Sequence, residues 1–245
     1  MISVVCVYND LRIYNEYLLP SIQRQHGNHE FIALDNQDGY FSSAAQALNH
    51  GGRKATGAYI MFVHQDVRLN SGDWLDRAEE MLRLTPNLGI AGVAGKRDRS
   101  GVITALTHGD RPKLAGHLQP TKPLRVQTID ECLFFVPREV FVAINMDEST
   151  CENWHLYAVD YSLSIQERGL TAYVLPLQAY HESEGQLSEA YFVALRKIVA
   201  KHKGHYSTIY TTVWDWSTAI PIRMQRAYCQ LIRRIRKLMA SMRAR

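Results

Sequence analysis

The carboxylate best placed for chemistry in this chain is Asp66, which ends an apolar run. Residues 59–63 predict a buried strand, and His64, Gln65 and Asp66 follow it as a polar tip. In an open α/β sheet, ligands bind just beyond the carboxyl ends of the strands. A carboxylate in that position can hold a divalent cation against a phosphate. The sequence therefore predicts a cation and phosphate site around Asp66.

Polar side chains also end two earlier predicted strands. The first cluster is Tyr8 and Asn9, and the second is Asp35 and Asn36. Loops are generally polar, so any one such cluster is weak evidence. Three clusters at three strand ends are much less expected by chance, and we expect them to point into one crevice. Asn9 and Asp35 are suited to bind the edge of a uracil base, which carries both donors and acceptors.

Strands and helices alternate in the segment that must position these side chains. The order β-α-β-α-β predicts an α/β fold with a Rossmann-like, mostly parallel central sheet flanked by helices. Apolar runs predict strands, and helical spacing or caps predict helices. The expected strands are 2–7, 31–34, 59–63 and 89–94, and the expected helices are 11–25, 43–56 and 73–84.

The second half of the chain is less regular. Residues 96–123 are rich in Gly, Pro, Arg, Asp and His with little periodicity, and predict an extended loop or a short hairpin across the cleft. An apolar segment, 126–136, contains Asp130 and Glu131. The remaining predicted elements are helices at 138–144, 160–168 and 188–202 and a strand at 171–175.

Composition indicates a globular protein of the reducing cytoplasm. Of 245 residues, 46% are hydrophobic and 21% are charged, which argues against overall disorder. The four cysteines are scattered and form no C-x-x-C pair, so a structural zinc site is not expected. The sequence has no run of eighteen apolar residues, so we expect no transmembrane helix. The apolar stretch at the N-terminus is too short for a signal peptide.

The positive charge of the chain is concentrated at its C-terminal end. The formal charge is +4, yet residues 221–245 carry eight basic residues and no acidic one, so the rest is at about −4. Apolar residues recur at helical spacing in this tail, which predicts a basic amphipathic helix. Such a helix suits the anionic inner face of a membrane, or alternatively packs on the domain or on the second subunit of a homodimer. We expect no nucleic-acid partner, because the body is acidic and no recognition motif is present.

At this point the sequence resembles the family 2-type glycosyltransferases, which have the A-type nucleotide-sugar fold. The resemblance lies in four motifs along residues 2–70. They are a strand ending in Tyr-Asn at 3–9 (SVVCVYN), a strand ending in Asp-Asn before Gly at 33–39 (ALDNQDG), an Asn-Gly helix leading into Gly-Ala-Tyr-Ile at 48–60 (LNHGGRKATGAYI), and a strand ending in a metal motif at 64–67 (HQDV).

The metal motif departs from the usual Asp-x-Asp of this family, because His64 replaces its first acid. It is similar to a subgroup with His-Gln-Asp-Val at this place, and the resemblance implies that Asp66 is the metal ligand. Two roles remain open for His64, a contact to ribose or diphosphate and a structural role. The resemblance implies that the nucleotide-sugar is bound by Tyr8, Asn9, Asp35, Asn36, Asn49, Lys54, His64 and Gln65.

The second half carries three further motifs of the family. Residues 126–141 resemble its acceptor-side strand, and residues 154–163 resemble the segment that supplies the catalytic base in inverting members. The resemblance implies that His181, in a His-x-Ser element at 181–185, completes the metal shell. It also places on the acceptor side the residues Asp130, Glu131, Trp154 and His155.

We expect Asp160 to be the catalytic base. Two readings stay open beside it. Many relatives carry their acid two positions earlier, where this chain has Ala158, so His155 would be another substitute; and Asp160 would also serve as the N-cap of the helix that follows it.

The expected activity is therefore that of a metal-dependent, inverting glycosyltransferase. It would move sugar from a nucleotide-diphospho-sugar, with UDP expected, to a hydroxyl on a glycan or lipid-linked acceptor, as in cell-surface polysaccharide or glycolipid synthesis. The cofactor would be Mn²⁺ or Mg²⁺, with imidazole favouring Mn²⁺. The alternative is a non-catalytic nucleotide-sugar-binding protein of the same fold. We expect a catalytic domain over 1–205, with a nucleotide-sugar half at 1–95 and an acceptor half at 96–205, and a helical extension over 206–245.

Overall fold

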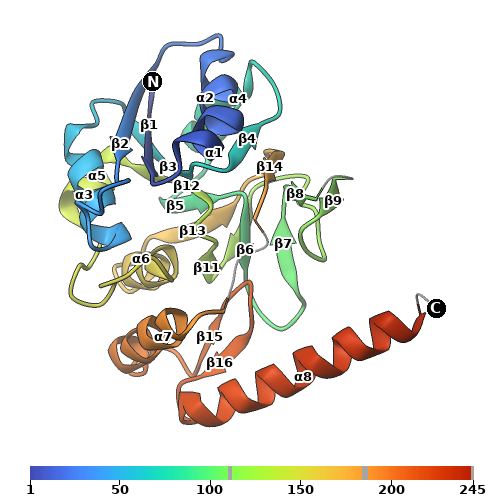
Figure 1. The fold of residues 1–245 in the computed structure, drawn as a ribbon. Helices are drawn as coiled ribbons and strands as arrows, with labels where there is room; N and C mark the ends of the chain where they lie inside the picture. The colour runs from blue at the N-terminus through green and yellow to red at the C-terminus, as the bar shows by residue number, and fades with distance from the viewer. Residues whose placement is uncertain (110–111, 184–186, 244–245) are drawn as a thin grey trace.

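A mixed seven-stranded sheet forms the centre of the protein (Figure 1). The computed structural model describes residues 1–109, 112–183 and 187–243, without the side chains of residues 233 and 236–243. From one edge to the other, the strands are β2 (His29–Asp35), β1 (Ile2–Tyr8), β3 (Tyr59–His64), β12 (Leu133–Pro137), β5 (Leu88–Gly92), β13 (Thr171–Val174) and β10 (Leu124–Val126).

Most strands of this sheet are parallel, as the sequence predicts. β1 pairs in parallel with β2 and β3, and β13 pairs in parallel with β5. β12 lies between β3 and β5 and is antiparallel to both, and β10 is antiparallel to β13. The carboxyl ends of β1, β2 and β3 therefore meet at one edge, which brings the three polar clusters together.

Two hydrophobic cores cover the two faces of the sheet. Side chains alternate between the faces of a strand, so Val4 and Cys6 of β1 pack into one core while Val5 packs into the other. The first core includes α1 (Leu11–Glu16), α2 (Leu18–Gln23) and α4 (Trp74–Leu84). The second core includes α3 (Ala44–Lys54), α5 (Arg138–Ala143) and α6 (Tyr157–Gln166).

A third core lies beneath α6, and it is built by the C-terminal part of the chain. Leu163 of α6 packs there with Phe192, Trp216 and Cys229. The elements that contribute are α7 (Glu189–His202), the hairpin of β15 (Thr208–Tyr210) with β16 (Asp215–Ser217), and α8 (Ile222–Arg243). Residues 206–243 thus contain a hairpin followed by a helix, where we expected a helical extension alone over 206–245.

The described part of residues 96–123 contributes short strands to two small sheets. The first sheet has the order β11-β6-β7 and the second has the order β4-β14-β8-β9. Their strands are β6 (Ala94–Lys96), β7 (Val102–Thr104), β11 (Thr128–Ile129), β4 (Val67–Leu69), β14 (Ala179–His181), β8 (Leu106–His108) and β9 (Lys113–Leu114). A hairpin was one of the two alternatives predicted for this segment, and β6 with β7 forms one, as does β8 with β9.

Two predicted helices have different bounds in the structure. The single helix expected over residues 11–25 is two, α1 and α2, which meet at Tyr17. The helix expected from Asp160 begins three residues earlier, after Leu156 in a left-handed conformation with φ 63°. Asp160 is therefore inside α6 and is not its N-cap.

Other local predictions agree with the structure. Ser43 and Ser188 cap α3 and α7 through their side chains. The four cysteines are free and buried. Among the described residues, no helix has the length and apolar character needed to cross a membrane.

Candidate functional site

Three side chains could hold a metal ion at the carboxyl edge of the sheet. His64, Asp66 and His181 each offer a ligand atom, and these atoms lie within 4.8 Å of one another. The Nε2 atom of His181 is 3.3 Å from Oδ1 of Asp66. The cluster combines the expected ligands Asp66 and His181 with His64, whose role the sequence left open.

Strand pairing brings Asp66 and His181 together. β14 is antiparallel to β4, with His181 opposite Val67, the residue next to Asp66. Beyond this pair, the Glu182 N–H donates to the carbonyl of Asp66 at 3.1 Å, and the Ser183 N–H donates to its carboxylate at 3.3 Å. These backbone hydrogen bonds thus hold the Asp66 carboxylate beside the His181 imidazole.

The protonation states of this cluster follow from burial and charge. Burial alone would raise the pKa of Asp66, but the hydrogen bond and positive charge of His181 outweigh it and hold that pKa well below its ordinary value. In return, burial would lower the pKa of His181, but Asp66 outweighs it and raises that pKa. Burial and the charge of His181 lower the pKa of His64, so His64 is neutral near pH 7, as a metal ligand must be.

The surroundings of His64 fit a ligating imidazole. Its Nε2 atom is 2.8 Å from the hydroxyl of Tyr157, which in turn donates to the carbonyl of Glu131 at 3.3 Å. Metal-bound histidines commonly engage their second ring nitrogen in such a hydrogen bond. Two imidazoles with one carboxylate suit Mn²⁺ better than Mg²⁺, which prefers oxygen ligands.

A pocket of about 570 Å³ opens at the ends of β1, β2 and β3, and we call it the strand-end pocket. It brings together six of the residues predicted to bind nucleotide-sugar or metal. They are Tyr8, Asn9, Asn36, His64, Gln65 and Asp66.

Tyr8 and Asp35 form one wall region beside this pocket. The Tyr8 ring stacks on Tyr14 with centroids 4.5 Å apart, and its hydroxyl donates to Asp35 at 3.2 Å. The Asp35 carboxylate also accepts from the backbone and side chain of Gln37. These hydrogen bonds, the Gln37 backbone bond foremost, lower the pKa of the Asp35 carboxyl, so it is an ionised acceptor at the end of β2.

Two predicted ligands of the nucleotide-sugar already use their amides within the protein. Gln65 accepts from the N–H groups of Asn9 and Asp10 and donates to the Asn9 side chain, so it ties β1 to β3. Asn36 exchanges hydrogen bonds with the backbone of Phe41 and closes the loop after β2. Both line the pocket, and both shape its walls.

Two other predicted ligands lie outside the pocket. Asn49 is buried in α3, and its amide bonds the backbone of Met146 and the carboxylate of Glu148. Lys54 is exposed at the last turn of α3, and α3 begins beside the pocket at Ala44. The prediction that Asn49 and Lys54 touch the nucleotide-sugar does not fit these positions, because α3 leads away from the strand ends.

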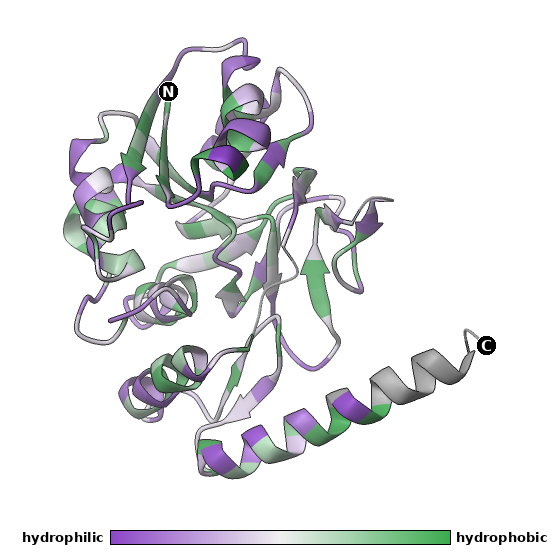
Figure 2. Ribbon diagram, in the orientation of Figure 1, coloured by the Kyte–Doolittle hydropathy of each residue, from purple (hydrophilic) through white to green (hydrophobic). Residues whose placement is uncertain are grey.

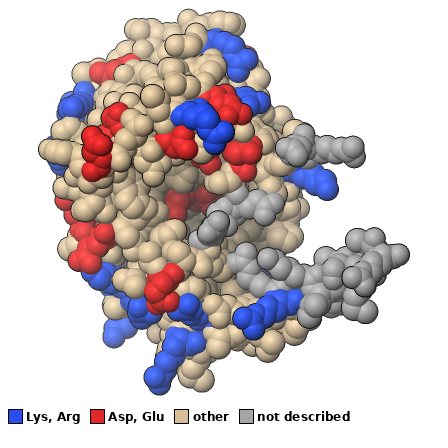
Figure 3. Space-filling model, in the orientation of Figure 1, with Lys and Arg blue, Asp and Glu red and all other residues tan. Residues whose placement is uncertain are grey.

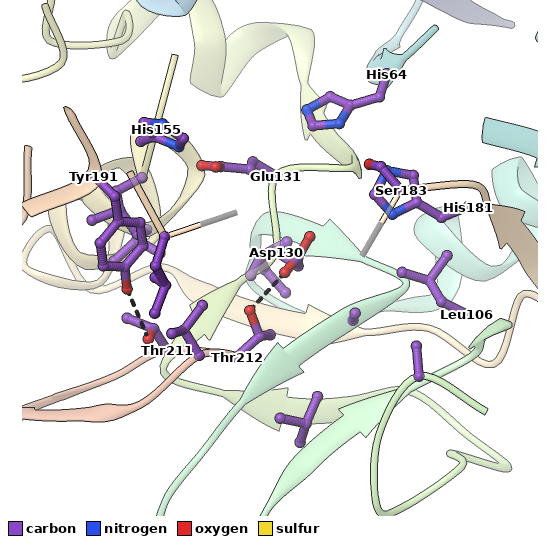
Figure 4. A pocket seen from close by; sticks show the side chains of 18 of the residues that line it. His64, Leu106, Asp130, Glu131, His155, His181, Ser183, Tyr191, Thr211 and Thr212 are labelled. Atoms are coloured by element: carbon purple, nitrogen blue, oxygen red, sulfur yellow. Dashed lines mark hydrogen bonds between the residues drawn. The ribbon is translucent and has the colours of Figure 1, made fainter. Parts of the chain in front are cut away.

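A second pocket, of about 600 Å³, lies on the other side of the metal cluster, and we call it the acid pocket. Figure 4 shows Asp130 and Glu131 in its middle, between the two metal-cluster imidazoles and His155. Figure 3 shows acidic side chains at the bottom of a hollow on this face. All four residues expected on the acceptor side line the acid pocket, namely Asp130, Glu131, Trp154 and His155.

Glu131 is the carboxylate that lies between the two pockets. It lines both of them and is half-buried, and its buried Oε2 atom has no hydrogen-bond partner among the described residues. Burial, with the charge of Asp130, raises the pKa of Glu131 well above its ordinary value. The backbone N–H groups of Leu156 and Tyr157, at the start of α6, act in the opposite direction and partly offset this rise in pKa.

Asp130 is held more tightly than Glu131. Its Oδ2 atom accepts from the Thr212 hydroxyl at 2.7 Å, and its Oδ1 atom accepts from the Cys132 N–H at 3.2 Å. Thr212 comes from the loop between β15 and β16, so the C-terminal hairpin contributes to the wall of the acid pocket (Figure 4). Sequence reasoning missed Thr212 and Tyr157, since no local pattern links them to residues far away in the chain.

Asp160 lies elsewhere in the structure. Its side chain is only 2% exposed and accepts from Lys201 and His202 of α7, both at 2.8 Å. It lines neither pocket. The prediction that Asp160 is the catalytic base does not fit this position, because α6 turns this side chain toward α7 and away from the sheet.

The fold and the two-pocket site define the protein as a glycosyltransferase of the A-type fold. Residues 3–198 match the model of a family described as "Glycosyltransferase like family", and the chain belongs to this family. A protein described as "ATP synthase subunits region ORF 6" from Fuscovulum blasticum is 27% identical over 220 residues, which cover 83% of this chain and 84% of that protein. The family predicted from the sequence motifs is thus confirmed.

Solved structures with the same fold include three with nucleotide ligands. GalNAc-T7 with UDP, GalNAc and Mn²⁺ has a TM-score of 0.59 at 13% identity and 81% coverage of this chain. The mannosyltransferase PcManGT from Pyrobaculum calidifontis with GDP-Man and Mn²⁺ has a TM-score of 0.55 at 15% identity, and the match covers 84% of this chain. S. aureus TarS with UDP-GlcNAc has a TM-score of 0.56 at 12% identity, and the match covers 82% of this chain. This chain matches 47%, 64% and 66% of their respective lengths.

Proposed function

We propose that this protein is a metal-dependent, inverting glycosyltransferase that uses a nucleotide-diphospho-sugar. The observation that carries the proposal is the position of the metal cluster between two pockets, with Glu131 lining both. In this arrangement the strand-end pocket binds the nucleotide and the acid pocket binds the acceptor. The complexes of the structural neighbours with UDP, UDP-GlcNAc and GDP-Man support a nucleotide-sugar donor.

His64, Asp66 and His181 would hold the cation, and the Mn²⁺ in two structural neighbours supports this choice over Mg²⁺. The bound ion would neutralise the charge that develops on the diphosphate leaving group. Tyr8 in the same pocket and Asp35 beside it are placed to hold the base of the nucleotide, since their ring and carboxylate lie at the ends of β1 and β2. A uracil ring, with donors and acceptors on one edge, fits the ionised acceptor Asp35, and we propose UDP as the carrier.

Glu131 is the base in this proposal, in place of Asp160. The acceptor hydroxyl transfers its proton to the Glu131 carboxylate as its oxygen bonds to the anomeric carbon, and the bond from that carbon to the diphosphate oxygen breaks. The Glu131 carboxylate lines the acid pocket, so an acceptor hydroxyl bound there can reach it. The raised pKa of Glu131 makes it a stronger base than an ordinary carboxylate. Attack from the side opposite the leaving group inverts the anomeric centre.

The acceptor in this proposal is a hydroxyl on a glycan or on a lipid-linked sugar. The acid pocket combines polar groups near Glu131 with an apolar wall that includes Val102, Leu106 and Trp214. Aromatic and aliphatic surfaces of this kind suit the apolar faces of sugar rings and an attached lipid. We place the reaction in the cytoplasm, in cell-surface polysaccharide or glycolipid synthesis.

A non-catalytic nucleotide-sugar-binding protein is the second candidate. The observation that favours it is Ala158, which stands where many relatives carry an acid, and which is buried in α6. The two candidates bind the same ligand, so they differ only in turnover.

Donor hydrolysis and nucleotide titration test the proposal together. Isothermal titration with UDP, with and without Mn²⁺, should show metal-dependent binding. UDP-sugars incubated with the protein and Mn²⁺ should release free sugar and UDP, which ion-exchange chromatography quantifies. Metal-dependent binding without any release would identify the binding protein, and absence of metal-dependent binding would contradict both candidates.

A further inference from the structure

Helix α8 carries an apolar row that the body of the protein leaves uncovered. Met224, Tyr228, Leu231 and Ile235 are 60%, 59%, 54% and 43% exposed. Their spacing places them within about 60° of one another around the helix axis. Four large apolar side chains in one exposed line are unusual for a solvated helix, and they indicate an interaction surface.

The opposite side of α8 is the one that packs on the protein. Ile222 and Cys229 are buried in the third core, about 140° from the exposed row. Arg226 lies over the ring of Phe192 at 4.4 Å and pairs with Glu189 of α7. The first turns of α8 are therefore held in place, and the apolar row is exposed. Figure 1 shows α8 along one edge of the molecule, and Figure 2 shows hydrophobic and hydrophilic residues alternating along its described turns.

The charge around this row has one sign. Residues 221–245 contain no Asp or Glu. Arg223 and Arg234 are exposed and lie on the flank of the row, and Figure 3 shows basic side chains along this edge of the molecule. The same apolar spacing continues in the sequence to Leu238 and Met242, with further basic residues between them, although those side chains lie outside the described part of the chain.

The row is also close to the acid pocket. Trp214, which lines that pocket, packs edge-on against Tyr228 with ring centroids 6.1 Å apart. Val213, beside it in the same loop, lines the pocket and is itself partly exposed. A surface that contacts Tyr228 would therefore lie next to one wall of the acid pocket.

We propose that α8 is a membrane-surface helix, which inserts its row of Met224, Tyr228, Leu231 and Ile235 into an anionic lipid bilayer. The apolar row supplies buried area, and the flanking arginines supply attraction to the headgroups. The bilayer then lies beside the rim of the acid pocket. If the proposed function holds, this position favours an acceptor that is anchored in the lipid.

A second copy of the chain is a poorer occupant for the same row. Two α8 helices packed along their rows would bring arginines together with no carboxylate on either helix to pair with them. Like charges brought together on a low-dielectric interface oppose association. Anionic headgroups have the complementary sign, so the charge pattern selects the lipid surface.

Vesicle flotation with the full-length protein tests this proposal without any assay of transfer. Phosphatidylcholine vesicles with and without phosphatidylglycerol are the probes. We expect strong binding only with the anionic lipid, and weaker binding at high salt. Leu231→Ser and Ile235→Ser should each lower the partition coefficient about tenfold, because each removes one inserted side chain. Arg223→Gln and Arg234→Gln should lower it and also reduce its dependence on salt.

Leu84→Ser is the matched control, since Leu84 on α4 is a leucine that is 67% exposed, somewhat more than Leu231. It should leave the partition coefficient unchanged, and thermal unfolding should show that every variant remains folded. Absence of binding to anionic vesicles, or equal binding by the Leu231→Ser and Leu84→Ser variants, would overturn the proposal. A dimer in light scattering that Leu231→Ser dissociates would overturn it in favour of the second copy. Because lipid binding is measured directly, its failure leaves the proposed transfer reaction separately testable.

Discussion

The imidazole of His181 lies 3.3 Å from the carboxylate of Asp66, and backbone pairing of β4 with β14 creates this contact. The two residues come from opposite halves of the chain. His64 and Asp66 lie between β3 and β4, whereas His181 is brought to them by β14, which pairs with β4 in a small sheet. The metal centre is therefore a product of the assembled fold, and the pair supplies the first prediction.

Asp66→Asn should remove most of the metal affinity. The substitution keeps the shape of the side chain but takes away the charge that neutralises the cation and fixes His181. We expect at least about 100-fold weaker Mn²⁺ binding, more than the loss typical of a residue outside the ligand set. Titration of Mn²⁺ in the presence of UDP measures this. Asp76→Asn, an exposed acid on α4, is the control and should bind Mn²⁺ like the wild type.

His64→Asp should change which metal the protein prefers. Replacing imidazole with a second carboxylate gives an oxygen-rich ligand set, and oxygen ligands favour Mg²⁺ relative to Mn²⁺. We expect the ratio of Mg²⁺ to Mn²⁺ affinity to rise in this variant, as measured by competition titration. His64→Ala serves as the comparison, since it should weaken both metals. An unchanged ratio in His64→Asp would show that His64 is not a ligand.

Glu131→Gln should abolish turnover while it leaves the donor bound. An amide cannot take the proton of the acceptor hydroxyl, so kcat should fall by about 10²–10⁴-fold. The affinity for UDP and Mn²⁺ should be retained, because Glu131 is not in the metal cluster. Steady-state kinetics and titration on the same preparation separate the two quantities. A variant that keeps its kcat would exclude Glu131 as the base.

Asp130→Asn should shift the pH dependence of turnover. Burial first, and then the charge of Asp130, raise the pKa of Glu131 well above 4.5. The base works when ionised, so activity should rise with pH through that raised pKa. Without the neighbouring negative charge the pKa falls, and the acid limb of the kcat profile should move to lower pH. Thr212→Val keeps the charge of Asp130 and removes only its hydrogen bond, so its acid limb should move less.

Asp160→Asn should cost stability and spare catalysis. Its carboxylate is buried against Lys201 and His202, and removal of one partner of a buried pair costs about 3–5 kcal/mol. Denaturant unfolding measures this loss. Glu189→Gln removes an exposed partner of Arg226 and should cost about 0–1 kcal/mol. If Asp160→Asn instead kept its stability and lost kcat, the original assignment of Asp160 as base would regain support.

Local sequence predicted much of the donor side of the protein. The strands that become β1, β2 and β3 are apolar runs whose polar ends mark the strand-end pocket, and Ser43 caps α3 where a helix was predicted to begin. These predictions hold because strand burial, helix caps and strand-end ligands are set by residues within a few positions of one another.

Function assigned to single polar residues was less reliable. Asn49 and Gln65 have side chains that could bind a nucleotide-sugar, but both amides form hydrogen bonds with backbone groups of the protein. The sequence does not reveal these hydrogen bonds. A polar side chain that is hydrogen-bonded within the protein has fewer groups left to bind a ligand. The same holds for Asp160, whose partners Lys201 and His202 come from a helix that follows it by many residues.

The sequence by itself determined the alternating α/β order, the family motifs and the place of Asp66 at a strand end. Only the tertiary structure decided that His64 joins Asp66 and His181, that Glu131 and not Asp160 lies between two pockets, and that β7, β8 and β9 pair into two small sheets. The physical reason is distance along the chain. Hydrophobic periodicity indicates local secondary structure. The partners of a buried charge or of an edge strand are instead set by packing between segments that no local pattern connects.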